Sequence, residues 1–291
     1  MAETNKNLGA RFTFPGTAIS VNQMGYGAMQ LSGPGVFGAP KDRAAALNIL
    51  RTAVDHGVNH IDTSDYYGPH ITNQIICEAL YPYPKDLVIV SKVGAKRDEK
   101  GGWLPAITAE DIIDAVHDNL RHLKLDALDI VNLRSMHSVH GPAEGSMEEP
   151  LAVLNELKQQ GFIKHIGLSN VTRAQIDQAQ LITPIVCVQN HYNIVHRHDD
   201  ELILTLAEKG IAFVPFFPLG GFTPLQSTEL TSIAHALGAS PMQVALAWLM
   251  QRSPNMLLIP GTSSIDHLME NLAAGAIKFS KEILTRLNSL T

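Results

Sequence analysis

Eight short apolar runs, separated by amphipathic stretches, constrain the fold of this chain more than any other feature of its sequence. Runs of this length that lack strict alternation are typical of strands buried on both faces of a sheet. The predicted strands are Met24–Ala28, Val58–Ile61, Leu87–Ser91, Ala127–Leu133, Ile163–Gly167, Ile185–Gln189, Ala212–Pro215 and Met256–Ile259.

Helical patterns lie between these runs, and their alternation with strands indicates the fold class. The predicted helices are Arg43–His56, Ala109–His122, Pro150–Gln160, Arg173–Leu181 and Asp199–Lys209. Strands that alternate with helices pair in parallel through right-handed crossovers. Eight such units predict an α/β fold, a closed (β/α)8 TIM barrel, rather than an open sheet.

Both ends of the chain depart from this alternation. The segments Arg11–Phe14 and Ala18–Ser20 flank Pro15-Gly16-Thr17, a pattern typical of a β-hairpin, and we expect this hairpin to close the N-terminal mouth of the barrel. After Gly220 a loop over Gly221–Gln226 leads to two extra C-terminal helices, over Thr228–Leu237 and Pro241–Met250. Because the sequence contains no linker and no low-complexity segment, residues 1–291 are predicted to form a single domain.

The composition of the chain disfavours nucleic acids and membranes as binding partners. A net charge of −6 and the lack of a basic run disfavour nucleic-acid binding. Residues 1–10 lack the apolar core of a signal peptide, and no apolar stretch approaches the roughly 20 residues that span a bilayer. The two cysteines, Cys77 and Cys187, are expected to be buried thiols rather than a disulfide. We therefore expect a cytoplasmic protein that contacts no membrane; the sequence leaves its oligomeric state open.

The segment from Ile61 to Gly68 supplies the residues of a proton donor. Asp62 follows one predicted strand closely, Tyr67 lies five residues further on, and Lys92 follows the next strand. An isolated tyrosine titrates near pH ~10, which is too high for efficient acid catalysis at neutral pH. A neighbouring ammonium group favours the phenolate, and a carboxylate can hold that ammonium in place. The trio predicts protonation of a carbonyl oxygen as hydride reaches the carbon.

The residues that follow the other predicted strands test the barrel hypothesis, because barrel active sites lie at the C-terminal ends of the strands. These positions are mostly polar although the strands themselves are apolar, as expected for residues that contact a ligand. They are Gly27 to Gln30, Asp62 with Tyr67, Lys92, Arg134, Ser169-Asn170, Gln189-Asn190, Phe216 and Pro260-Gly261-Thr262.

These motifs, in this order, resemble those of the aldo-keto reductases over about residues 21–271. The resemblance is carried by Asp62–Gly68, Ser91-Lys92, Gly167–Asn170, Ile259–Thr262 and Glu270-Asn271. Three further segments are most similar to the bacterial branch that includes pyridoxal reductase: Gly25–Leu31, Val131–Arg134 and Pro215–Phe222.

The resemblance implies a catalytic tetrad of aspartate, tyrosine, lysine and histidine. Asp62, Tyr67 and Lys92 match the first three members, whereas Arg134 occupies the usual histidine position. An arginine is a permanent cation that can polarise a carbonyl oxygen or bind an anionic group on the substrate. A structural ion pair inside the rim is the alternative role for Arg134. His137 is a candidate substitute for the histidine if its loop folds back.

The same resemblance implies NADPH as the cofactor, with NADH as the alternative. Ser169, Asn170 and Gln189 match residues that hold the nicotinamide carboxamide, and Phe216 matches the ring that stacks on it. A turn and helix cap at Ser169-Asn170, and a plain core role for Phe216, are the structural alternatives. The remaining implied cofactor contacts are Gly27, Met29, Pro218, Leu219, Gly220, Gly221, Pro260, Gly261, Thr262, Ser263, His267, Glu270 and Asn271.

The branch implies reduction of pyridoxal to pyridoxine. A broad aldehyde-detoxifying reductase and a nicotinamide-binding regulatory subunit are the alternatives; the intact trio disfavours the latter. The residues expected to line a pocket for a flat aromatic aldehyde are Tyr26, Met29, Phe37 and Phe222, with His137 beside them.

Two further sequence patterns resemble binding motifs, one for a dinucleotide and one for zinc, but neither is expected to form that site. Gly33–Gly38 matches the G-x-G-x-x-G fingerprint but does not lead straight from a strand into a helix, so we interpret it as a substrate loop. His191, His196 and His198 invite a zinc site, but their spacing lacks a second ligand cluster. They are interpreted as solvated loop histidines, and no metal is expected.

Overall fold

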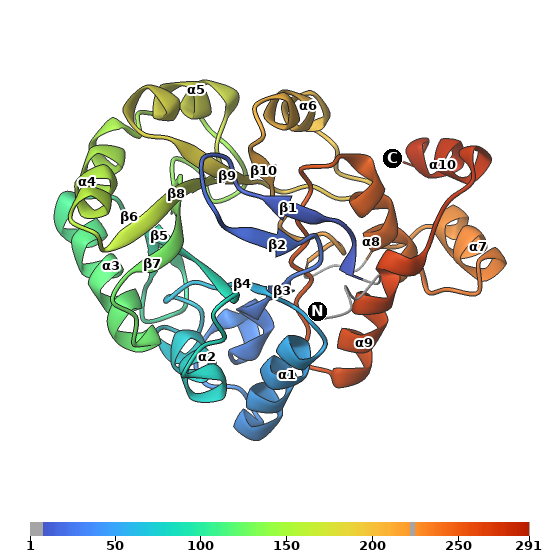
Figure 1. Ribbon diagram of the computed structural model, residues 1–291, viewed down its shortest axis with the longest axis horizontal. Helices are drawn as coiled ribbons and strands as arrows, with labels where there is room; N and C mark the ends of the chain where they lie inside the picture. Colours follow the sequence, from blue (N-terminus) through green and yellow to red (C-terminus); the bar gives the residue numbers. More distant parts are fainter. Residues whose placement is uncertain (1–7, 222–224, 291) are drawn as a thin grey trace.

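The computed structural model describes residues 8–221 and 225–290, and its centre is a ring of parallel strands surrounded by helices (Figure 1). Neighbouring strands in the ring follow chain order, and every pair is parallel. The strands are β3 (Tyr26–Gly27), β4 (His60–Asp62), β5 (Val88–Arg97), β7 (Leu128–Arg134), β8 (Ile163–Ser169), β9 (Ile185–Gln189) and β10 (Ala212–Phe213).

The eighth position of the ring is filled by an extended segment at residues 255–260 that bridges the first and last strands. Met24 pairs with Leu258 and Phe213 pairs with Met256, both in parallel. The Leu258 amide donates to the Gln23 carbonyl at 2.7 Å, and the Gly25 amide donates to the Leu258 carbonyl at 2.8 Å. The predicted α/β barrel with eight parallel units is therefore confirmed.

Helices cover the outside of the barrel. The main ones are α1 (Arg43–Asp55), α2 (Ile71–Leu80), α3 (Ala109–Leu123), α4 (Glu148–Gln159), α5 (Arg173–Ile182), α6 (Asp200–Glu208), α8 (Pro241–Arg252) and α9 (Ile265–Ala273). Polar N-cap residues define where several begin: Thr108 caps α3, while Thr172 and Ser240 form capping boxes at α5 and α8.

The two extra helices predicted near the C-terminal end are present as α7 (Thr228–Ala236) and α8. A further helix, α10 (Lys281–Asn288), was not predicted. No single helix in the described ranges is long and apolar enough to cross a membrane; α7 and α8 reach that length only together, across a bend of 89°. The sequence reading gave no bounds for α2, α9 or α10. Ser264 and Ser280, the N-caps of α9 and α10, are signals that it overlooked.

The predicted N-terminal hairpin is present and closes one mouth of the barrel. Strands β1 (Arg11–Thr13) and β2 (Ser20–Asn22) pair antiparallel, and Figure 1 shows them across the centre of the ring. Phe14 and Val21 are buried against inward-facing residues of the barrel strands, among them Val88 and Ile130. The second strand of the hairpin begins at Ser20, two residues later than the segment expected from the sequence.

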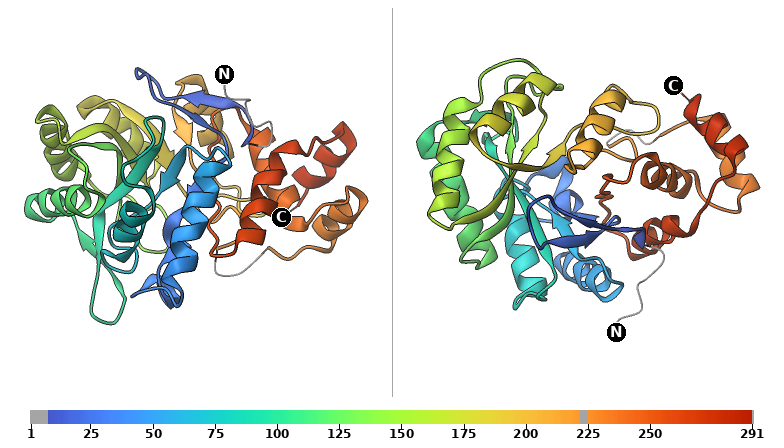
Figure 2. Two further views of the ribbon diagram at one scale, coloured as in Figure 1. Left: turned by 60° about the horizontal axis from the view of Figure 1, so that its bottom comes forward. Right: turned by 45° about the horizontal axis from the view of Figure 1, so that its top comes forward.

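At the opposite end, β5 continues well past its predicted end at Ser91. It runs to Arg97 and turns into β6 (Trp103–Ala106), forming an antiparallel hairpin that extends beyond the barrel (Figure 2). Lys92 therefore lies within a strand rather than just after one. The hairpin brings Arg97 and Trp103 over the C-terminal mouth, where the sequence reading expected neither residue.

Candidate active site

The centre of the candidate site is a buried ion pair between Asp62, at the end of β4, and Lys92, on β5. The Lys92 ammonium donates to Asp62 Oδ1 and, at 2.9 Å, to the Thr63 carbonyl. The two charged side chains are 5% and 7% exposed. Burial lowers the pKa of Lys92, but the Asp62 carboxylate and the Tyr67 oxygen outweigh it, and the pKa lies above its ordinary value. Lys92 is therefore a fixed cation.

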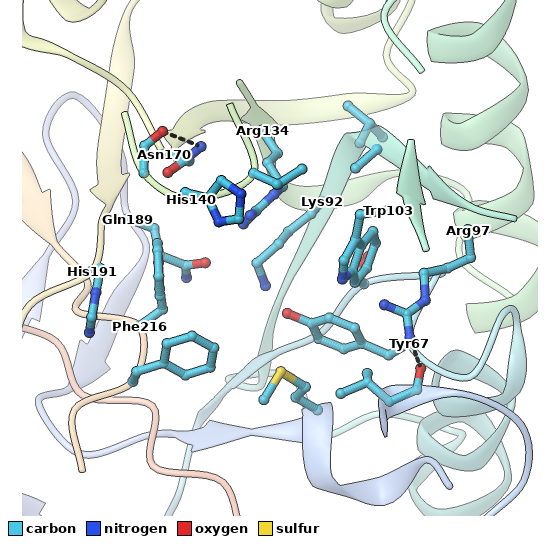
Figure 3. Close-up of a pocket in the computed structure, with 18 of the residues that line it drawn as sticks. Tyr67, Lys92, Arg97, Trp103, Arg134, His140, Asn170, Gln189, His191 and Phe216 are labelled. Carbon is cyan, nitrogen blue, oxygen red and sulfur yellow. Dashed lines mark hydrogen bonds between the residues drawn. The ribbon is translucent and has the colours of Figure 1, made fainter. Parts of the chain in front are cut away.

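Tyr67 lies on the cavity side of this ion pair. Lys92 Nζ is 5.2 Å from the centre of the Tyr67 ring, and Figure 3 shows the Tyr67 hydroxyl directed toward the Lys92 ammonium group. On the other side of Asp62, Gln189 Nε2 donates to Oδ2 at 2.9 Å. The structure thus brings together the predicted trio, and it adds Gln189 as a second support of the carboxylate.

A network of polar side chains fixes the loop that carries Tyr67. Asp65 is buried and accepts hydrogen bonds from His70 Nδ1 at 2.6 Å, His122 Nδ1 at 2.8 Å and Asn73 Nδ2 at 3.0 Å. Donation by His70 raises the pKa of that histidine. One oxygen of Asp65 and one ring nitrogen each of His70 and His122 lie within 4.8 Å of one another, a spacing that could also hold a metal ion. Because the Nδ1 atom of each of the two histidines faces an Asp65 oxygen, we interpret the cluster as a brace for the loop.

Arg134, the last residue of β7, is held without an acidic partner. Its Nε contacts Met136 Sδ at 3.4 Å, and its guanidinium carbon is 6.0 Å from the centre of the Phe216 ring. Among residues 8–221 and 225–290, no salt bridge involves Arg134. The structural alternative of an ion pair inside the rim is therefore wrong. Burial lowers the pKa of this guanidinium.

Tyr67, Lys92 and Arg134 face one cavity of about 390 Å³, called the main cavity below (Figure 3). This volume lies within the range of roughly 300–1,000 Å³ that holds small ligands. Aromatic side chains from different elements form much of its wall; they are Trp103, His140, His191, Phe216 and Phe217. The wall of the main cavity therefore combines polar side chains with aromatic surfaces.

Arg97 and Trp103 are site residues that the sequence reading missed. The guanidinium carbon of Arg97 is 4.3 Å from the centre of the Trp103 ring, and Arg97 Nη2 donates to the Gly35 carbonyl at 2.6 Å and the Val36 carbonyl at 3.1 Å. Arg97 thereby ties the β5–β6 hairpin to the Gly33–Gly38 loop. Because Gly35 and Val36 line the main cavity, the position of this loop fits its interpretation as a substrate loop.

The loop after β7 folds back over the cavity, but it presents a different histidine from the one expected. His140 lines the main cavity, whereas His137 Nε2 lies 3.2 Å from the Ser146 carbonyl, and His137 is not part of the cavity wall. Asn170 fixes this loop: its Nδ2 donates to the carbonyls of Ser135, Ser138 and Gly141 at 3.0, 2.9 and 3.3 Å. The Asn170 amide nitrogen, expected on the cofactor, thus binds the chain itself, while the helix cap expected in the structural alternative is provided by Thr172.

Two of the aromatic residues expected in the pocket lie elsewhere. Tyr26 is fully buried, and its hydroxyl donates to the Thr262 carbonyl at 2.6 Å, so it supports the rim from beneath. Phe37 is 38% exposed and contacts Arg97 on the outer side of the loop. Met29 does line the main cavity. Phe222 lies outside the described residues.

The histidines of the suspected zinc pattern stack on one another instead. The rings of His191 and His196 are 3.9 Å apart and nearly parallel, and His191 also stacks against Phe216 at 5.6 Å. Burial lowers the pKa of His191 to about 4, with His196 and His198 adding to the effect. His191 is thus a neutral part of the cavity wall. The interpretation of all three as solvated was wrong for this residue.

A second, smaller cavity of about 100 Å³ continues from Tyr67 between the Phe216–Gly221 segment and the residue 259–261 segment. Its lining includes many of the predicted cofactor contacts: Gly27, Met29, Gln189, Phe216, Pro218, Leu219, Gly221, Pro260 and Gly261. Neither cavity includes Ser169, Gly220, Thr262, Ser263, His267, Glu270 or Asn271.

Some of these outlying residues have structural partners. Glu270 accepts a hydrogen bond from Ser240 Oγ at the start of α8, and Asn271 is buried. Ser263 and His267 are exposed near the start of α9. Ser169 lies at the end of β8, and its buried Oγ has no hydrogen-bond partner among the described residues.

A parallel barrel that carries a buried lysine–aspartate pair beside a phenol, at the C-terminal rim, defines a class of barrel enzymes built for proton transfer to a carbonyl oxygen. The sequence model of the "Aldo/keto reductase family" matches residues 23–291. This chain belongs to the aldo/keto reductase family and is an oxidoreductase that acts on small carbonyl substrates.

Individual relatives agree with this assignment. The chain is 63% identical over 280 residues to pyridoxine 4-dehydrogenase of Escherichia coli (strain K12), covering 96% of this chain and 98% of the relative. It is 38% identical to the uncharacterized oxidoreductase C215.11c of Schizosaccharomyces pombe, covering 92% and 86%. Among solved structures, the thermostable aldo-keto reductase Tm1743 superposes with a TM-score of 0.82 at 29% identity, covering 97% and 100%. The chain is thus an aldo-keto reductase closely related to pyridoxine 4-dehydrogenase.

Proposed function

We propose that this enzyme reduces pyridoxal to pyridoxine with NADPH, and that Tyr67 is the proton donor. The observation that carries the proposal is the buried Lys92 ammonium, held between the Asp62 carboxylate and the Tyr67 ring. The relative of 63% identity named pyridoxine 4-dehydrogenase supports this choice of substrate. A broad aldehyde reductase is the alternative, supported by the largely apolar cavity wall.

The second cavity fits the nicotinamide end of NADPH. Its rim is crowded with backbone: a Cβ added at Gly27 would lie 2.4 Å from the Ile259 carbonyl oxygen. Gly221, with φ +71°, allows the chain to turn beside the groove. The Phe216 ring, which lines both cavities, is available for stacking. A Klebsiella pneumoniae aldo-keto reductase of similar fold (24% identity, TM-score 0.78) was solved in complex with NADPH.

The preference for NADPH over NADH rests on the residues near the start of α9. Thr262, Ser263 and His267 occupy the segment where the resemblance places the 2′-phosphate. Ser263 and His267 are exposed and can reach an anion, and the positive end of the α9 dipole adds to its attraction. Glu270, by contrast, contacts Ser240 in this structure and must move to reach the adenosine.

When bound, NADPH supplies the hydride that reaches the carbonyl carbon. The Tyr67 hydroxyl donates its proton to the carbonyl oxygen as negative charge develops there. The Lys92 ammonium, fixed by Asp62 and the Thr63 carbonyl, stabilises the phenolate that remains. Gln189 holds the far oxygen of Asp62, so the cation stays oriented toward the phenol. Asp62 is accordingly a positioning residue, whereas Tyr67 acts on the substrate directly.

The lining of the main cavity supports an aromatic aldehyde as the substrate. Trp103 and Phe217 offer apolar surfaces for a flat ring, and Tyr67 and Arg134 provide polar contacts at the deep end. A ring that enters between the aromatic side chains brings its aldehyde to the Tyr67 hydroxyl. A dedicated substrate should therefore be small, planar and polar at one edge.

The test compares Tyr67→Phe with Tyr66→Phe, a matched control at the adjacent residue, which is absent from the lining of both cavities. Loss of the acid should lower kcat for pyridoxal by about 10²- to 10⁴-fold, and the control should remain near the wild-type rate. Parallel rates with NADPH and NADH, and with pyridoxal and simple benzaldehydes, test cofactor and substrate. A Tyr67→Phe enzyme with normal turnover would refute the proton donor; a clear preference for benzaldehydes would refute the pyridoxal assignment.

A further inference from the structure

The positive charge in the main cavity exceeds what the reaction described above uses. Lys92, Arg97 and Arg134 line the cavity, whereas none of the described lining residues is an aspartate or glutamate. The charge of Lys92 is compensated by Asp62, which lies behind it. Burial lowers the pKa of His191 in the cavity wall to about 4, so this histidine is neutral at pH 7 and supplies no further cation.

The two arginines differ in what they already contact. Arg97 Nη2 is committed to two backbone carbonyls of the Gly33–Gly38 loop, and its guanidinium stacks on Trp103. Arg134 has only the Met136 sulfur at its Nε, and none of the hydrogen bonds among the described residues uses its two terminal nitrogens. Arg134 is therefore the cation available to a ligand.

A half-buried guanidinium with no anion beside it is costly, since a charge taken out of water is stabilised only by a partner. Arginine presents parallel N–H groups that fit two oxygens at once. Arg134 and Tyr67 face the same cavity and are close enough for the Tyr67 oxygen to raise the pKa of the arginine, against the larger effect of burial. A substrate whose carbonyl oxygen meets Tyr67 thus places its neighbouring ring substituent next to Arg134.

Resting on the function proposed above, we infer that the enzyme selects aldehydes with an anionic oxygen on the ring carbon adjacent to the one that bears the carbonyl. One terminal N–H of Arg134 donates to the carbonyl oxygen and the other to the anionic oxygen. Pyridoxal has this arrangement, because its ring hydroxyl is adjacent to the aldehyde and ionises readily. Arg134 is then a specificity-determining residue as well as an electrophile.

The test uses two matched probes, 2-hydroxy-5-nitrobenzaldehyde and 2-methoxy-5-nitrobenzaldehyde. The nitro group keeps the hydroxyl of the first probe ionised at neutral pH, and the second probe cannot ionise. The measured quantity is the ratio of kcat/KM for the hydroxy probe to that for the methoxy probe. Comparing this ratio between enzymes cancels the difference in intrinsic reactivity. A charge-assisted hydrogen bond predicts that Arg134→Gln lowers the ratio about 10- to 100-fold.

Two controls locate the effect. Arg173→Gln, at an exposed arginine on α5, should leave the ratio unchanged. With 4-hydroxy-3-nitrobenzaldehyde the anionic oxygen is opposite the aldehyde, so Arg134→Gln should affect it no more than the methoxy probe. Arg134→Lys keeps the positive charge but lacks the two parallel N–H groups of arginine, so its hydroxy-to-methoxy ratio should lie between those of Arg134→Gln and the wild type. This variant provides the same test if the glutamine variant does not fold.

Equal losses for the hydroxy and methoxy probes in Arg134→Gln would overturn the inference, because Arg134 would then serve the carbonyl oxygen alone. An equal loss for the para-hydroxy probe would also overturn it, since the arginine would then act as a general positive charge. In either case, pyridoxal turnover that requires Tyr67 would leave the proposed function standing. Absence of pyridoxal turnover would refute the function itself.

Discussion

The buried pair between Asp62 and Lys92 predicts a separation of stability from catalysis. In Lys92→Met the Asp62 carboxylate, 5% exposed, loses its cation and keeps only the hydrogen bond from Gln189. Breaking one side of a buried ion pair costs about 3–5 kcal/mol of the free energy of unfolding. Because the Gln189 bond remains, we expect a loss near 3 kcal/mol, at the lower end of that range.

The double variant Asp62→Asn/Lys92→Met removes both charges and keeps an acceptor for Gln189. It should be more stable than the sum of the two single losses implies, with a coupling energy of about 2 kcal/mol. Its turnover should nevertheless stay about 10²- to 10⁴-fold below wild type, since no ammonium group remains beside Tyr67. Stability would thus return while activity does not.

Urea unfolding at pH 7, followed by circular dichroism, measures the stabilities, and aldehyde-dependent oxidation of NADPH measures turnover. Lys96→Met is the matched control, because Lys96 pairs with Asp111 at 2.9 Å on the surface with 41% and 24% exposure. That change should cost less than about 1 kcal/mol. The reasoning is refuted if Lys92→Met is as stable as the control, or if the two single losses simply add in the double variant.

Three further predictions concern other parts of the molecule. Burial lowers the pKa of His60 to about 4, so this site takes up a proton in the unfolded chain alone as pH falls from 6.5 toward 4. His60 should therefore contribute about 3 kcal/mol to the loss of stability over this window, and the loss measured for His60→Leu in urea titrations should be smaller by that amount. In Gly167→Ala the new Cβ would lie 2.1 Å from Asn132 Oδ1, which predicts a loss of about 1–3 kcal/mol in the free energy of unfolding. Gly141→Ala is the control, because its Cβ would meet nothing within 4 Å. Equal urea midpoints for the two variants would contradict this prediction. His267→Arg should raise the ratio of kcat/KM for NADPH to that for NADH about tenfold through a charge-assisted hydrogen bond to the 2′-phosphate. An unchanged ratio would show that residue 267 does not contact this phosphate.

The architecture was largely readable from the sequence, because it depends on local periodicity. Apolar runs buried on both faces predicted the strands, and helical patterns between them predicted the parallel ring. The N-terminal hairpin followed from turn residues at Pro15–Thr17. The predicted ends of strands were less accurate where pairing with a distant segment lengthens a strand. Strand β5 runs on to Arg97 because β6 folds back and pairs with it. The apolar Val93 to Ala95 and the turn at Gly101-Gly102 were signals of that hairpin.

The predicted trio also came from the sequence, because Asp62, Tyr67 and Lys92 belong to neighbouring strands whose C-terminal ends must meet. The full set of residues that line the main cavity could not be predicted from the sequence. His140 rather than His137 faces the cavity because Asn170, which is 29 to 35 residues further along the chain, binds three carbonyls of that loop. No local pattern encodes such a contact.

The sequence by itself thus determined which chemical groups gather at one rim of a barrel, since strand order and side-chain period fix that. Only the tertiary structure decided which of those groups are left for a ligand. Asn170 is committed to the chain and Tyr26 is buried beneath the rim, whereas Arg134 is free of acidic partners among the described residues. The physical reason is that a polar group becomes available only when packing leaves it unpaired, and pairing is settled between segments distant in sequence.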